Sequence, residues 1–156
     1  MKKGFTCGSF DLLHAGHIKM LEEAKTKCDY LIVGLQEDPS IDRDYKNKPI
    51  QTLEERNIQL SAVKYVDEIV VYKTEKDLLD LIKSVNPDVR ILGVDHKNRN
   101  FTGHELSIDL YFNSRDHAWS TSDLRKRIFI DEYFKFEWCD WEIDWQEVNH
   151  DSYEFS

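Results

Sequence analysis

Two histidines three residues apart, His14 and His17, follow a short apolar stretch near the N-terminus. Imidazole N–H groups donate hydrogen bonds, and this spacing puts both rings on one side of a helical turn. Gly8 allows a sharp turn and a ligand close to the backbone, and Gly16 removes a side chain between the rings. Because the N-terminus of a helix attracts anions, these residues predict a phosphate-binding turn.

Other phosphate loops and metal sites do not match this segment. The dinucleotide fingerprint GxGxxG is absent, and no GK[ST] of a Walker A loop follows. A zinc site built from Asp11, His14 and His17 lacks a clear further ligand at the usual spacing. We therefore assign no metal ligands. The alternative is that both histidines only cap or pack a helix.

A second cluster of hydrogen-bond donors lies near residue 120. Arg115 can donate two parallel hydrogen bonds to phosphate oxygens. Ser120-Thr121-Ser122 offers hydroxyls and backbone N–H groups at the start of a predicted helix. A plain helix N-cap is the alternative for these hydroxyls, although a cap and a phosphate site can coexist. The second cluster is therefore predicted to bind the same anion as the first.

The pattern Gly8-x-Phe10-Asp11-x-x-His14-x-Gly16-His17 resembles the HxGH signature of the cytidylyltransferase-like nucleotidyltransferase superfamily. The likeness covers roughly residues 1–130 and is strongest to glycerol-3-phosphate, choline-phosphate and ethanolamine-phosphate cytidylyltransferases. The segment 114–125 is similar to the second signature of the family, RTEGISTS, but departs from it in the residue types at 116–119.

This resemblance implies roles for residues in both signatures and in two further loops. The residues with implied catalytic roles are His14, His17, Lys46 and Arg115. Those with implied nucleotide-binding roles are Cys7, Gly8, Ser9, Phe10, Asp11, Gly16, Asp95, Ser120, Thr121 and Ser122. Lys48 and Arg56 are the implied acceptor ligands, and Lys48 is also an alternative to Lys46 for the phosphate contact. Ordinary solvated charge is the alternative for each lysine.

The implied reaction is attack by a phosphate monoester oxygen on the α-phosphorus of a nucleoside triphosphate, with release of pyrophosphate. A phosphate dianion is already nucleophilic at pH 7, so positioning, donors and cations suffice without a general base. Mg²⁺ is the implied cofactor, held mainly by the triphosphate because the family has no dense carboxylate cage. The leading prediction is transfer of CMP from CTP to a small phosphorylated alcohol such as glycerol 3-phosphate.

Two alternatives stay open. Transfer of AMP from ATP to a sugar phosphate or a cofactor phosphate is the main one, since Pro49-Ile50-x-x-Leu53-Glu54-Glu55-Arg56 resembles sugar-phosphate adenylyltransferases about as well. Nothing in His14–His17 distinguishes the two bases. A hypothesis from another class is a non-catalytic nucleotide-binding module on the same fold, which would bind a triphosphate without releasing pyrophosphate.

Strands and helices that must position these residues alternate along the chain. Apolar runs predict strands at 4–7, 30–35, 68–72 and 89–93, and a polar–apolar alternation predicts one at 107–112. Helical patterns occupy 18–24, 52–65, 78–85 and 120–130, and a long polar loop occupies 36–51. This order predicts an α/β, Rossmann-like, doubly wound fold with a mainly parallel five-stranded sheet and helices on both faces.

Ligands of such sheets bind beyond the carboxyl ends of the strands. The segments after the first, fourth and fifth predicted strands are Gly8–His17, Gly93–Asp95 and Asn113–Thr121. These segments carry the residues with the most specific chemistry, and we expect the sheet to bring them together.

Composition limits the classes of partner. The 156 residues are 40% hydrophobic and 33% charged, which favours one soluble domain. We expect no membrane partner, because no apolar run approaches the roughly 20 residues of a membrane span and no signal peptide is recognised. A net charge of −9 argues against nucleic-acid binding. Three cysteines without a CxxC pair are typical of a reducing cytoplasm.

The last residues differ from the rest of the chain. We expect a nucleotidyltransferase domain at 1–132 and an acidic aromatic extension at 133–156, where seven acidic residues and one lysine give −6 of the net charge. The aromatic residues of the extension are Tyr133, Phe134, Phe136, Trp138, Trp141, Trp145, Tyr153 and Phe155. Because disordered tails rarely carry so many aromatics, we expect the extension to pack on its own subunit or on a second one. The family resemblance implies a homodimer.

Overall fold

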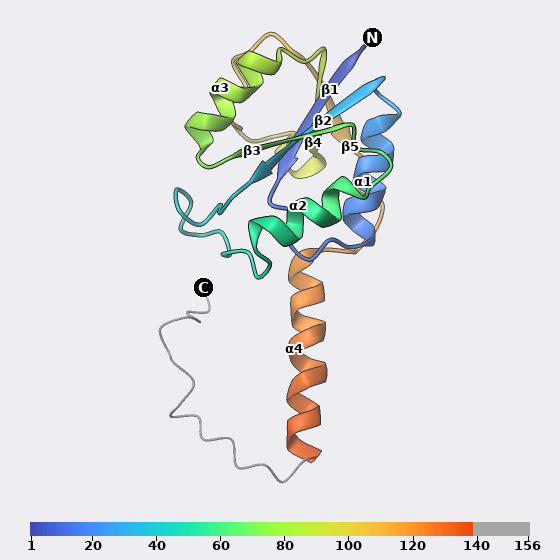
Figure 1. The fold of residues 1–156 in the computed structure, drawn as a ribbon, viewed down its shortest axis with the longest axis vertical. Helices are drawn as coiled ribbons and strands as arrows, with labels where there is room; N and C mark the ends of the chain where they lie inside the picture. Colours follow the sequence, from blue (N-terminus) through green and yellow to red (C-terminus); the bar gives the residue numbers. More distant parts are fainter. Residues whose placement is uncertain (139–156) are drawn as a thin grey trace. The chain divides into compact units, whose positions relative to one another are not determined.

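The structure is a computed structural model that describes residues 1–138. Five parallel strands form one sheet in the order β3-β2-β1-β4-β5 (Figure 1). The strands are β1 (Lys3–Gly8), β2 (Tyr30–Gln36), β3 (Glu68–Tyr72), β4 (Val89–Gly93) and β5 (Asp109–Asn113). The helices are α1 (Ala15–Lys25), α2 (Leu53–Ser61), α3 (Glu75–Val85), the 3₁₀ turn η1 (Val94–His96) and α4 (Thr121–Trp138). The predicted α/β, Rossmann-like fold is confirmed.

Strand β2 shows why helices must cover both faces of the sheet. Side chains of a strand alternate between its faces. Leu31, Val33 and Leu35 belong to a buried cluster that includes residues of α1 and α2. Ile32 belongs to a second cluster that includes residues of α3. The continuous apolar run of this strand is therefore buried on both sides, as its pattern predicts.

The strand order reverses between β1 and β4, which is where a crevice is expected in a parallel sheet. The chain moves from β1 to β2 and β3 on one side, and α3 then returns it to β4 on the other side of β1. Pairing of β1 with β4 is limited to Gly4 with Val89 and Phe5 with Arg90, so the carboxyl-terminal half of β1 is not paired with β4. A reversal of strand order of this kind is where parallel α/β sheets bind ligands.

Boundaries of several elements differ from the prediction. Helix α2 ends at Ser61 rather than near residue 65, because Ala62 and Val63 donate to carbonyls three residues back and close a tighter turn. Helix α3 begins at Glu75, after a capping box formed by Thr74 and Asp77. Strand β5 begins two residues later than predicted, and α4 continues past residue 130 to Trp138.

The chain divides into two compact units, Met1–Thr121 and Ser122–Ser156. The described part of the second unit is helix α4, which carries many exposed apolar side chains. They are Ile128, Phe129, Ile130, Tyr133, Phe134 and Phe136. The helix continues through the predicted domain boundary after residue 132. The rest of the predicted extension, including Trp141, Trp145, Tyr153 and Phe155, lies outside the described residues.

Candidate active site

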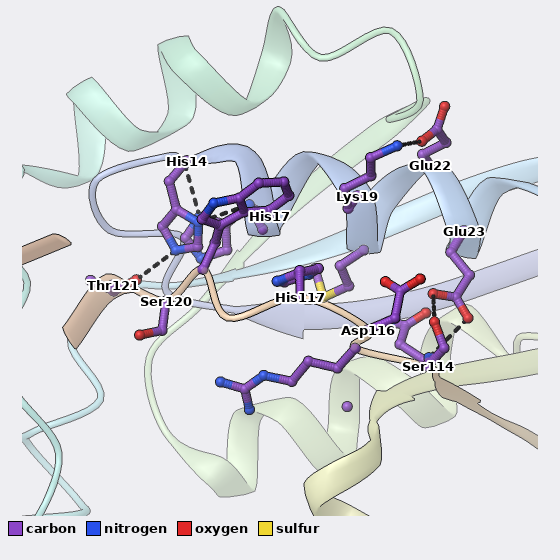
Figure 2. Close-up of a pocket in the computed structure, with 16 residues that line it drawn as sticks. His14, His17, Lys19, Glu22, Glu23, Ser114, Asp116, His117, Ser120 and Thr121 are labelled. Carbon is purple, nitrogen blue, oxygen red and sulfur yellow. Dashed lines mark hydrogen bonds and ion pairs between the residues drawn. The ribbon is translucent and has the colours of Figure 1, made fainter. Parts of the chain in front are cut away.

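A pocket of about 400 Å³ lies in the first unit, at the carboxyl ends of the strands (Figure 2). Residues 14–23, the start and middle of α1, form what we call the first wall. Residues 113–121, which follow β5, form the second wall. Gly93 at the end of β4 also lines the pocket. The sheet thus brings together the three segments that follow its first, fourth and fifth strands.

Helix α1 begins with a capping box in which both side chains are histidines. The Nδ1 atom of His14, the N-cap residue, accepts a hydrogen bond from Gly16 N at 3.0 Å. The Nδ1 atom of His17 accepts one from His14 N at 3.3 Å. The two rings stack with their centroids 3.9 Å apart. Both rings therefore lie on the same side of the first turn, as their spacing predicts.

This capping fixes the tautomer of each neutral ring. Because each Nδ1 accepts a backbone N–H, the proton of a neutral imidazole sits on Nε2. Thr121 Oγ1 lies 3.2 Å from His14 Nε2 and donates to Asp11 O at 3.3 Å, so the hydroxyl accepts from His14. The result is Nε2–H donors at a helix N-terminus, where the helix itself attracts an anion.

The electrostatics of the first wall favour neutral donors. Burial, and to a lesser extent the neighbouring His14, together lower the pKa of His17 to about 3. His17 is therefore neutral at pH 7. At that pH it can donate a hydrogen bond from Nε2, but it has no proton to give as an acid.

The turn before α1 holds two bulky residues in the left-handed region. Phe10 and Leu12 have φ values of 49° and 50°, a conformation that costs about 1–3 kcal/mol each in such residues. The Asp11 carboxylate accepts hydrogen bonds from Ile50 N and Gln51 N at 3.0 and 2.9 Å. Gln51 Oε1 accepts one from Leu12 N at 2.7 Å. The strained turn is thus held by segment 50–51, and Asp11 uses its carboxylate for this purpose.

Arg56 occupies a different position from the one implied for an acceptor ligand. Its side chain is 2% exposed and does not line the pocket. Four of its five N–H groups donate to backbone carbonyls, which belong to Ser9, Gln36, Glu37 and Gln51. The structure therefore supports a scaffolding role for Arg56, because burial leaves it little capacity to bind an acceptor.

Hydrogen bonds to Glu23 attach the second wall to the first. The Glu23 carboxylate accepts from Tyr111 Oη at 2.8 Å and from Ser114 N and Oγ at 3.0 and 3.1 Å (Figure 2). Arg115 follows with a positive φ of 45°, and its Nη1 pairs with Asp95 Oδ2 at 2.5 Å. This pair is largely exposed, and exposed ion pairs contribute little to stability. An incoming phosphate can therefore compete for Arg115.

The two walls also lie close together at Gly16. A Cβ atom added at Gly16 would lie 2.8 Å from Trp119 O, 2.9 Å from His117 Cε1 and 2.9 Å from His14 Cε1. The first of these is a backbone atom and cannot rotate away. A glycine is therefore required here by the neighbouring segment.

Predicted site residues separate into two groups. Those that line the pocket are His14, Gly16, His17, Arg115, Ser120 and Thr121. The described residues of the first unit that were predicted but do not line it are Cys7, Gly8, Ser9, Phe10, Asp11, Lys46, Lys48, Arg56 and Asp95. Several of these have structural places: the ring of Phe10 is buried in the core, and burial raises the pKa of the Cys7 thiol. Ser122 belongs to the second unit.

Positive charge gathers around η1. The pKa of His96 is lowered, first by burial and then by the positive charge of Lys46, while Asp95 opposes this and Arg90 and Arg43 add to it. Lys46 lies on an exposed loop. Lys46 and Asp95, which the sequence predicted as site residues, thus both act on the charge of His96, although neither lines the pocket.

Sequence reasoning missed several lining residues, among them Asn113, His117 and Trp119. Asn113 is the last residue of β5, and the other two follow it. The sequence predicted that the segment 113–121 as a whole would lie at the ligand site, without singling out these residues. A polar residue at the end of an apolar parallel strand, as Asn113 is, was the available signal.

Residues 1–138 contain neither a cluster of metal ligands nor a helix that could span a membrane. No group of three or more His, Cys, Asp or Glu side chains in residues 1–138 is arranged to hold a metal ion. Within the same residues, no helix has the length and apolar character that crossing a membrane requires.

A parallel sheet whose strand order reverses beside a turn of backbone and imidazole donors is typical of nucleotide-binding α/β proteins. The sequence profile of the cytidylyltransferase-like family matches residues 5–127, and the chain belongs to this family. The predicted membership of the superfamily is confirmed. The nearer likeness to glycerol-3-phosphate cytidylyltransferases stays a prediction.

Curated relatives include two proteins named bifunctional protein HldE. The one from Helicobacter hepaticus is 38% identical over 125 residues, which are 80% of this chain and 26% of the relative. The one from Hyphomonas neptunium is 39% identical over 107 residues, 68% of this chain and 22% of the relative. The chain therefore spans about a quarter of the length of these relatives.

Two solved structures of other proteins are similar to this chain in fold. A lipopolysaccharide core biosynthesis protein from Thermoplasma volcanium superposes with a TM-score of 0.54 at 26% identity, covering 85% of this chain and 89% of the other. A pantoate–β-alanine ligase from Francisella tularensis superposes with a TM-score of 0.52 at 19% identity, covering 86% and 71%. The second likeness shows the fold alone.

Proposed function

We propose that this chain transfers the AMP group of ATP to a sugar phosphate and releases pyrophosphate. The observation that carries the proposal is the pair of histidines at the start of α1, whose Nδ1 atoms accept from the backbone, so that each neutral ring carries its proton on Nε2 as a donor; in the nucleotide-free chain the His14 donor bonds to Thr121 Oγ1. Donors fixed in advance stabilise the charge that develops on a phosphoryl group more than mobile ones do. The family membership supports the reaction type.

In this reaction an acceptor phosphate oxygen forms a bond to the α-phosphorus, and the bond between that phosphorus and the bridging oxygen to the β-phosphate breaks. Pyrophosphate leaves with the electron pair. His14 and His17 would donate to oxygens of the triphosphate. Lys46 and Arg115 would neutralise the added charge, with Arg115 exchanging its exposed partner Asp95 for phosphate. No proton needs to be removed from a phosphate dianion, which agrees with a neutral His17.

Mg²⁺ is proposed to enter with the nucleotide. The described residues hold no cluster of carboxylates or imidazoles suited to a metal ion, so the triphosphate oxygens would supply most ligands. The ion would neutralise charge on the phosphates. The acceptor phosphate is proposed to meet Lys46, beside the cationic region around His96. A homodimer, which the family resemblance implies, stays a proposal.

The choice of ATP and of a sugar phosphate rests on similarity. The solved relative with the higher identity is named a lipopolysaccharide core biosynthesis protein, and a lipopolysaccharide core is built of sugars. The segment 49–56 also resembles sugar-phosphate adenylyltransferases. The second candidate is CMP transfer from CTP to a phosphorylated alcohol, favoured by the match of Ser120–Ser122 to the family signature RTEGISTS.

A pyrophosphate-release assay tests these candidates. Each of the four nucleoside triphosphates is supplied with Mg²⁺ and either hexose 1-phosphates, heptose 1-phosphates or glycerol 3-phosphate. We expect release with ATP and a sugar phosphate. Release only with CTP and glycerol 3-phosphate would favour the second candidate, and triphosphate binding without release under any condition would indicate a non-catalytic module.

A further inference from the structure

The second wall of the pocket contains a buried amide without a hydrogen-bond partner in residues 1–138. Asn113, the last residue of β5, is 3% exposed and lines the pocket. Neither its Nδ2 nor its Oδ1 atom bonds to another described residue. Buried polar groups in native proteins are nearly always paired. An amide left without a partner inside a pocket is therefore positioned to bond to what the pocket binds.

The same pocket is lined by a pair of stacked aromatic rings. The ring of His117 stacks on that of Trp119, with centroids 5.2 Å apart and an angle of 26° between the planes. The Nδ1 atom of His117 is buried and likewise has no partner among the described residues. Aromatic faces for stacking, together with donors and acceptors for a ring edge, are the chemistry that recognises a nucleobase.

The position of this cluster suits a base rather than a phosphate. The phosphate-binding histidines lie at the start of α1, and the pocket continues along the helix to Glu23, about 13 Å further at the rise of an α-helix. Figure 2 shows His14 and Thr121 at one end, the bonds from Ser114 to Glu23 at the other, and His117 between them. A nucleotide with its α-phosphate at the histidines would extend its base along this helix.

We propose that Asn113 is a specificity-determining residue that reads the edge of the nucleobase. Its Oδ1 accepts a hydrogen bond from an exocyclic amino group, and its Nδ2 donates to the neighbouring ring nitrogen. Asparagine makes this two-bond pair with adenine, and cytosine also presents an amino group beside a ring nitrogen. The substrate class is therefore a nucleoside triphosphate with an amino-substituted base, which deepens the proposed function and rests on it.

The test removes the amide and the amino group separately and together. Binding of ATP and of purine riboside 5′-triphosphate, which is ATP without its amino group, is measured by calorimetry for the wild-type chain and for Asn113→Leu. Leucine has a similar size and no polar atoms. Asn57→Leu on the exposed surface of α2 serves as the matched control. Ribose 5-triphosphate, which has no base, reports binding through the phosphates alone.

We expect the wild-type chain and the control to prefer ATP by about 5- to 150-fold, the worth of a two-bond base contact. In Asn113→Leu this preference falls to nearly one, while the affinity for ribose 5-triphosphate is unchanged. A preference that persists in the variant overturns the proposal. So does an equal loss for all three ligands, because that would mean a structural role.

Two further readouts separate this inference from the proposed function. If the wild-type chain turns over CTP rather than ATP, the same comparison is made with CTP and its analogue lacking the 4-amino group, with the same deciding outcomes. If it binds no triphosphate, the proposed function fails and this inference with it. The urea midpoint of nucleotide-free Asn113→Leu should equal or exceed that of the wild type, and a large fall overturns the proposal.

Discussion

The two walls of the pocket differ in how their polar groups are used. In the first wall, both histidine Nδ1 atoms accept backbone N–H groups, and the strained turn before them is held by the Asp11 carboxylate. In the second wall, the Asn113 amide and His117 Nδ1 have no partner within residues 1–138. The difference indicates that hydrogen bonds within the chain fix the proposed phosphate donors, whereas the groups proposed to select a base keep their hydrogen-bonding atoms for a ligand.

The largest expected effect is on the scaffold of the first wall. Arg56→Met leaves one buried and three partly buried carbonyls without their donor, and each unsatisfied buried group costs about 1–3 kcal/mol. We expect the free energy of unfolding in urea to fall by about 3 kcal/mol or more. Arg127→Met is the control, because its exposed pair with Asp123 is worth roughly 0.5 kcal/mol or less. A stable Arg56→Met protein with a raised acceptor KM would instead restore the acceptor-binding role.

The next largest effect is expected from removing the Nε2–H donor of His17 rather than the scaffold around Arg56. In His17→Asn, the shorter side chain keeps an oxygen near the position of Nδ1 to cap the helix but loses the Nε2–H group. We expect kcat for pyrophosphate release to fall by about 100- to 1,000-fold, as for loss of one preorganised donor, with little change in stability. His17→Ala should show the same kinetic loss and a further loss of about 1 kcal/mol in stability, because the cap is also gone. Near wild-type turnover in His17→Asn would refute the assignment of the donor.

The difference between the walls also explains what the sequence could predict. Strand β2 and the turn at Gly8–His17 are local: an apolar run and a dense motif carry their own information, and both the fold and the pair of rings follow from them. The sequence could not reveal the burial of Arg56, because its partners come from three other segments of the chain, the residues at 9, 36–37 and 51. A charged residue in a helix normally points to solvent, and only the packing of these segments buries it.

Asn113 is the opposite case, a pocket residue that the sequence did not predict as a site residue. Its burial depends on the packing of the end of β5, and the missing partners of its amide can be recognised only after every neighbouring donor and acceptor has been placed. The order of residue types along a chain does not predict which buried polar atoms lack a hydrogen-bond partner. The sequence therefore could not single out Asn113, and the choice between CTP and ATP stayed open.

A smaller effect is expected where the two walls touch. Gly16→Ala places a methyl group 2.8 Å from Trp119 O, so the backbone of the second wall must shift. Overpacking of this kind costs about 1–3 kcal/mol, and we expect a raised KM for the triphosphate with a smaller change in kcat. Asn57→Ala on the exposed surface of α2 is the control, since it changes a side chain far from this contact in sequence and adds no atom to the pocket. Equal stability and equal KM in the two variants would mean that the second wall does not press on Gly16.

The smallest effect is a pH dependence that belongs to the first wall. The pKa of His17 is about 3 in the folded chain, because of burial first, and about 6.5 in an unfolded chain. As the pH falls below 6.5, the unfolded state binds a proton that the folded state does not bind, so stability is lost down to about pH 3.

His17→Asn removes this contribution while the carboxylates titrate as before. We therefore expect the urea midpoint to fall less between pH 7 and pH 4 in His17→Asn than in the wild-type chain. Equal slopes in the wild type and His17→Asn would show that folding does not lower the pKa of His17, and the buried, neutral donor on which the comparison of the walls depends would be refuted.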